Sequence, residues 1–160
     1  MRSVAARVRS RLGSSDPVYK RLAPAVSELA RQADELVTVR DRLSAKVKRA
    51  DRAALVVRRD ELAARGKASK EAADAQKLVD EQIERVDRWK AESERASDRL
   101  DRVLEYLRAL DARIDDAGDR DAERTGVRVE EDARLLQDLE RDVESALQGA
   151  READRLLPRV

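Results

Sequence analysis

Apolar residues recur every seven positions along most of this chain. From Leu22 onward they alternate at steps of four and three, and the pattern is still readable at Ile114 after slipping by one residue near Gly66. A stripe only two positions wide is too narrow to sit in a globular core. It therefore predicts long helices that pack against other helices along their whole length.

The residues expected in the helix–helix seam form two series, one on each side of the slip. Leucine dominates one of the two stripe positions of the first series, as is usual in two-helix seams. Arg40 occupies a stripe position, so we expect its guanidinium to reach outward or to pair with a carboxylate. The predicted seam consists of Leu29, Leu36, Leu43, Val47 and Val57, followed by Val79, Val86, Trp89, Leu100, Val103, Leu107 and Leu110.

The slip near Gly66 allows two interpretations. Gly66 can end one helix and Ser69 can cap the next, so that residues 17–117 form an antiparallel hairpin with its turn near residues 65–69. The alternative is one unbroken helix in which the slip compensates for the drift between 3.6 and 3.5 residues per turn. The similar lengths of the two arms favour the hairpin.

The first arm contains one proline that disturbs the helical pattern. Pro24 predicts either a separate turn of helix over residues 17–23 or a bend in the long helix. Between Pro24 and about Arg65 no other residue interrupts the pattern, so we expect a continuous helix there.

Two further helices are expected on either side of the hairpin. Residues 1–16 form a short amphipathic helix and a turn, with Val4, Val8 and Leu12 on one face. Residues 118–126 carry several acids and two glycines and are predicted to be a linker. Residues 127–160 form a C-terminal helix that either folds back on the hairpin or reaches another subunit. The expected fold is all-α, an antiparallel coiled-coil hairpin with a short helix before it and a longer one after it.

The composition offers few of the residues that catalyse reactions or bind metals. Charged residues make up 43% of the chain and aromatic residues 2%, which is typical of long helices rather than of a compact fold with a substrate pocket. The chain has no His and no Cys, and so lacks the commonest general base, thiol nucleophile and transition-metal ligands. We therefore expect no enzyme activity, no catalytic residues, no cofactor and no metal.

Charge is nearly balanced overall but unevenly distributed. The net charge is +1, with a basic segment before Leu22 and an acidic region between Asp115 and Glu144. This asymmetry favours a staggered self-association in which the head of one subunit meets the tail of another, and the alternative is a solvated tail. The basic stretch from Arg40 to Arg59 lacks aromatic or amide groups beside its charges, so a nucleic-acid partner is not expected.

The N-terminal helix is the sharpest candidate for a binding surface. An apolar face flanked by arginines can lie on an anionic membrane, with copies on an oligomer acting together, or it can dock on the protein itself. No apolar run is long enough to span a bilayer, so we expect a cytoplasmic protein or a peripheral one on the inner face of the membrane. The predicted membrane or partner contact consists of Arg2, Val4, Arg7, Val8, Arg9, Arg11 and Leu12.

The order of these elements resembles the phage-shock-protein A family of bacterial ESCRT-III-like proteins. The resemblance is carried by Met1 to Leu12 as the lipid-facing helix, by the turn Ser15-Asp16-Pro17, and by the charged segment Arg59 to Arg65 near the hairpin turn. It implies a protein that polymerises on membranes.

From the residues themselves we expect a non-catalytic structural protein whose partner is another copy of itself, as a homo-oligomer or polymer. The alternative is a soluble scaffold, adaptor or assembly chaperone that docks a helical protein partner.

Overall fold

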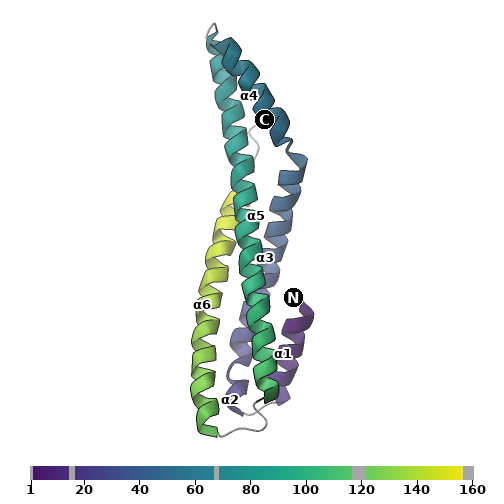
Figure 1. Cartoon of the computed structure of the whole chain (residues 1–160), viewed down its shortest axis with the longest axis vertical. Helices are drawn as coiled ribbons and strands as arrows, with labels where there is room; N and C mark the ends of the chain where they lie inside the picture. Colours follow the sequence, from purple (N-terminus) through teal and green to yellow (C-terminus); the bar gives the residue numbers. More distant parts are fainter. Residues whose placement is uncertain (1, 15–16, 67–68, 117–121, 157–160) are drawn as a thin grey trace.

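The protein is an elongated bundle of α-helices (Figure 1). The computed structural model describes residues 2–14, 17–66, 69–116 and 122–156. These residues form six helices and no strand, which confirms the predicted all-α class. The helices are α1 (Arg2–Ser14), α2 (Pro17–Lys20), α3 (Ala23–Arg49), α4 (Arg52–Gly66), α5 (Lys70–Asp116) and α6 (Ala122–Asp154).

The chain reverses direction between α4 and α5, so the structure has the hairpin arrangement rather than one continuous helix. The long helix α5 packs against α4 near the turn and against α3 further down (Figure 1). Residues 67–68 of the predicted turn lie outside the described residues, as do residues 15–16 and 118–121 of the other predicted connections and residues 157–160.

Pro24 stands in the first turn of α3, where the absence of a backbone N–H removes no intrahelical hydrogen bond. The residues before it form the separate short helix α2, which is the first of the two predicted arrangements. The predicted linker over residues 118–126 was too long, because α6 begins at Ala122. A single glycine, Gly126, costs a helix only ~1 kcal/mol and does not end it.

The first arm is not continuous, which corrects the prediction for residues 24–65. Ala50 has an extended backbone (φ −84°, ψ 113°) and ends α3. The carboxylate of Asp51 then accepts a hydrogen bond of 3.0 Å from the backbone N–H of Ala54, and so caps the N-terminus of α4. The break resets the phase of the heptad stripe from this point onward.

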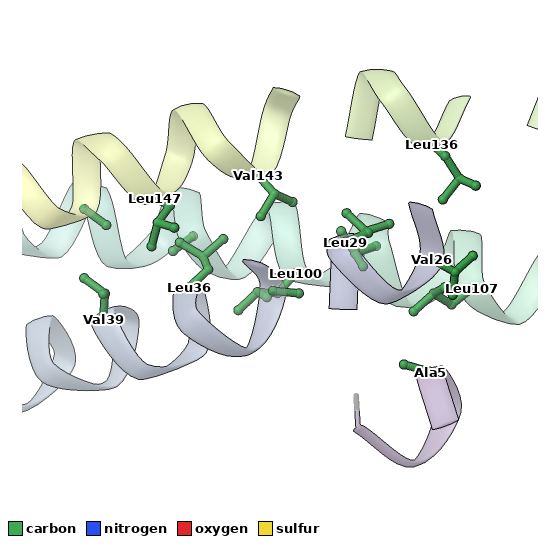
Figure 2. Close-up of a cluster of buried hydrophobic side chains, with 14 of the residues drawn as sticks. Ala5, Val26, Leu29, Leu36, Val39, Leu100, Leu107, Leu136, Val143 and Leu147 are labelled. Atoms are coloured by element: carbon green, nitrogen blue, oxygen red, sulfur yellow. The ribbon is translucent and has the colours of Figure 1, made fainter. Parts of the chain in front are cut away.

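The main core lies where α1, α3, α5 and α6 pack together (Figure 2). Leu29 and Leu36 of α3 lie between Leu100 of α5 and the side chains of α6, among them Leu136 and Leu147. The predicted C-terminal helix therefore folds back on the hairpin of its own chain. Because four helices share this core, its leucines and valines are almost completely covered.

Candidate docking surface

The basic amphipathic helix α1 is docked on the body of the protein. Ala5, Val8 and Leu12 are buried in the core, and Val4 packs partly against it. In this conformation Val8 and Leu12 are covered by the body of the protein, which is the second of the two roles expected for this helix, docking on the protein itself. The physical reason is that α1 packs on α3 and α5, and its apolar side chains join the core that these helices share.

Ion pairs hold the basic face of α1 in the same place. Arg7 pairs with Asp111 of α5 at 3.0 Å, and Arg11 pairs with Asp111 at 3.3 Å and also with Asp115. The basic head thus meets acids of its own chain. Arg9 is exposed, and the side chain of Arg2 lies outside the described residues.

A second ionic contact joins the first turns of α6 to the last turns of α5, at the lower end of the bundle in Figure 1. Asp132 of α6 is completely buried and pairs with Arg113 of α5. The Tyr106 hydroxyl donates a hydrogen bond of 3.1 Å to the backbone carbonyl of Asp132. Burial raises the pKa of the Asp132 carboxyl above its ordinary value, although the charge of Arg113 acts in the opposite direction. Burial also raises the pKa of Tyr106.

The upper end of α6 is held by Trp89 and Lys46. The indole N–H of Trp89 donates a hydrogen bond of 2.9 Å to the carbonyl of Ala153, in the last turn of α6. Lys46 pairs with the Asp154 carboxylate at 2.8 Å, donates to the Asp154 carbonyl, and lies 5.3 Å from the centre of the Trp89 ring. Both side chains therefore supply the hydrogen bonds that the C-terminal carbonyls of a helix lack.

Beyond the end of α6, an apolar groove opens between α4 and α5. Its volume is about 420 Å³. Leu55, Val86 and Trp89 line it together with small alanines, and Asp51, Arg58, Gln82 and Arg85 stand around it. Two other grooves, along the sides of α6, are lined mainly by charged side chains. The α4–α5 groove thus combines an apolar floor with a polar rim, the composition of a protein-docking surface.

Large apolar side chains are also exposed in this region. Val57 of α4 is 58% exposed and Leu78 of α5 is 55% exposed. Val57 was predicted in the seam, and this prediction is wrong because the break at Ala50 and Asp51 rotates α4. Leu55 takes the inward position instead and packs against the core.

The other predicted seam residues are covered. Val47 is partly buried, and the remainder are buried: Leu29, Leu36, Leu43, Val79, Val86, Trp89, Leu100, Val103, Leu107 and Leu110. Ser44 of α3 and Ser93 of α5 are hydrogen-bonded to each other at 2.7 Å, and Arg40, the polar position of the predicted stripe, pairs with Asp41 at 2.7 Å. Arg40 follows the expectation that it would pair with a carboxylate.

Sequence reasoning missed the groove and the buried Asp132. The groove depends on where α6 ends, and only the pairing of Trp89 and Lys46 with its last turn reveals that point. Asp132 looked like one more acid in an acidic region. Its helical spacing from Leu136 and Val143, at steps of four and seven, places it on the buried stripe and is the signal that could have identified it.

The chain matches no protein-family profile, no curated protein and no solved structure. Among the described residues, no helix combines the length and the apolar character needed to cross a membrane.

Proposed function

We propose that this chain is a non-catalytic structural protein that assembles with other copies of itself through helix–helix contacts. The observation that supports the proposal is the hairpin end, where α4 and α5 line the apolar groove and Leu78 of α5 is exposed among the described residues. Exposed apolar surface of this kind, with a polar rim, commonly marks a surface that another protein covers.

The predicted membrane contact of α1 is not part of this proposal. Its apolar face is already covered by α3 and α5, and Arg7 and Arg11 are already paired with Asp111 and Asp115. Membrane binding would first require these contacts to break.

Sedimentation velocity of the purified chain, from low-micromolar to sub-millimolar concentration, tests the proposal. We expect the average sedimentation coefficient to rise with concentration, because the monomer and the assembly are in equilibrium by mass action. A chain that remains monomeric over the whole range would overturn self-assembly. That result would favour the alternative function, a soluble adaptor whose hairpin end docks a helix of another protein.

A further inference from the structure

We propose that the break between α3 and α4 is a two-state elbow. The first arm of the hairpin changes between the bent form described above and a straight helix in which α4 is turned by one residue. The groove between α4 and α5 belongs to the bent form, since Ala50, Asp51 and Ala54 at the elbow line part of it. As a regulation of docking this inference rests on the proposed function, whereas the elbow itself is a property of a single chain and is tested on one.

The sequence at the break contains nothing that forbids a continuous helix. Residues 25–65 include neither glycine nor proline, and alanine, which stands at position 50, is the best helix former. The backbone of Ala50 is nevertheless extended, with φ −84° and ψ 113°, and Figure 1 shows the bend where α3 ends and α4 begins. Because local propensity favours the straight form, other contacts must hold the bend.

A few polar contacts at the elbow replace the hydrogen bonds of a continuous helix. The backbone N–H of Ala54 would bond there to the carbonyl of Ala50, and it bonds instead to the carboxylate of Asp51 at 3.0 Å. The backbone N–H of Arg52 bonds to the carbonyl of Ala50 at 3.0 Å, two residues back rather than four. The Arg52 guanidinium also donates two hydrogen bonds to Asp87 of α5, at 2.6 and 2.8 Å. A single substitution can remove the cap or the ion pair.

Helix α4 carries two alternative apolar stripes. The first stripe continues the heptad pattern of α3 through Ala54, Val57 and Ala64, and all three side chains are exposed in the bent form. The second stripe lies one residue later, at Leu55 and Leu62, and both leucines are partly buried. A turn of α4 by one residue, or ~100°, would exchange the two stripes. The sequence therefore supports two registers of α4 against α5.

The two forms offset each other in burial and in backbone bonding. The bent form covers Leu55 but gives up helical hydrogen bonds across the break, whereas the straight form would restore these bonds and cover Val57 instead. A leucine exceeds a valine by only one methylene group, so the difference in burial is small. Turning α4 would carry Arg52 away from Asp87, and this ion pair therefore acts as a latch on the bent form. Two packings so closely balanced make a switch.

Thiol labelling of a single introduced cysteine reports the register, because the chain has no cysteine of its own. At a concentration where the chain is monomeric, Val57→Cys should react with a maleimide about 10-fold faster than Leu55→Cys. Adding Asp51→Ala removes the cap and places the best helix former at the break. This change should make Leu55→Cys react about 10-fold faster and Val57→Cys about 2-fold slower, since the two positions exchange their environments.

The opposite signs of these two changes separate an exchange of registers from a loosening of α4, which would make both cysteines react faster. Ala53→Pro is the matched variant that holds the bend. Proline in the first turn of α4 removes no intrahelical hydrogen bond, whereas in a continuous helix it removes the bond to Arg49 and clashes with the preceding turn. Added to Asp51→Ala, it should return both labelling rates to within about 2-fold of the unchanged background.

Spin labels measure the elbow without altering either stripe. Ala45→Cys and Ala63→Cys place the labels at exposed positions of α3 and α4, on the two sides of the break. In a straight helix the two α-carbons lie ~27 Å apart. Asp51→Ala should raise the fraction of molecules with the straight-helix distance about 5-fold, and Ala53→Pro should remove that fraction. Arg52→Gln, which releases Asp87, should act in the same direction as Asp51→Ala.

The elbow is overturned if Asp51→Ala leaves both labelling rates and the label distances unchanged, or if it makes both cysteines react faster. A chain that is monomeric at every concentration would remove the proposed self-assembly and leave the elbow standing. If the chain does associate, Asp51→Ala should weaken association about 5-fold and Ala53→Pro should not, because only the bent form keeps the groove. A shifted register with unchanged association would overturn the regulation of docking.

Discussion

The two ends of this molecule use the same few residue types and bury them differently. At the lower end α1, α3, α5 and α6 share one core, and Leu29, Leu36 and Leu107 are completely covered. At the hairpin end α4 and α5 are the only two helices of the described part of the chain that pack together, and Leu78 is 55% exposed. The difference lies in the number of helices that meet, because two helices leave one side of each apolar stripe open.

This comparison separates residues that stabilise the fold from residues that are available for binding. A leucine in the four-helix region contributes to the free energy of unfolding of the monomer. A leucine on the open side of the hairpin contributes mainly when a second chain covers it. The predictions below test that division, from the largest expected effect to the smallest.

The largest effect is expected for Leu36→Ala compared with Leu78→Ala. Leu36 is completely buried among three helices, so its truncation should lower the free energy of unfolding by about 3 kcal/mol. Leu78→Ala should change it by less than about 0.5 kcal/mol. Urea unfolding followed by circular dichroism, at a concentration where the chain is monomeric, measures both. Equal losses would show that the hairpin end has a core as complete as the lower end.

The second effect concerns local opening, measured by hydrogen exchange. Amides of α4 have few apolar neighbours to hold them, so they should exchange roughly tenfold or more faster than those in the middle of α3. Under the proposed self-assembly through the hairpin end, raising the protein concentration should also slow exchange in α4 and in the first turns of α5. Exchange in α4 that is slow and independent of concentration would contradict the comparison.

Much of the lower end could be predicted from the sequence, and much of the hairpin end could not. The heptad stripe identified Leu29, Leu36, Leu100 and Leu107 as buried because these residues lie in unbroken helices. It failed at Val57, where the break at Ala50 and Asp51 contains no glycine or proline to reveal it. The heptad pattern also does not indicate how many helices pack against the apolar stripe.

The coverage of each stripe depends on contacts between distant parts of the chain. The docking of α1 depends on Arg11 meeting Asp111 and Asp115, and the end of α6 depends on Trp89 and Lys46. These pairings join residues far apart in sequence, so periodicity alone cannot identify them. For this reason the candidate docking surface emerged only from the structure.

The third prediction concerns the boundary between the two ends. Trp89→Phe keeps an aromatic ring in place but removes the hydrogen bond to the carbonyl of Ala153. We expect a loss of about 1 kcal/mol in the free energy of unfolding, with the last turn of α6 more open to hydrogen exchange. Thermal unfolding by circular dichroism measures the loss. Trp89→Ala is the companion variant and should cost more, since it also empties the floor of the groove.

The smallest effect is a dependence of stability on pH that originates at Asp132. Its folded pKa is raised above the unfolded value, so the protonated carboxyl favours the folded state. This stabilisation is complete below the unfolded pKa and is lost as the pH rises through the folded pKa. Asp132→Asn cannot ionise, and so the stability of this variant relative to the unchanged chain should increase as the pH rises from about 3.5 to 7.

The change with pH is the test, rather than the difference at any one pH. Asparagine loses the ion pair with Arg113 and so shifts stability by an amount that is unrelated to titration. Urea unfolding of both chains across the pH range separates the two contributions, because titration appears only in the change with pH. Asp138→Asn, which changes an exposed carboxylate of the same helix, is the matched control for the loss of one negative charge. A relative stability of Asp132→Asn that falls with rising pH would mean that the charge of Arg113 outweighs the effect of burial on the Asp132 carboxyl.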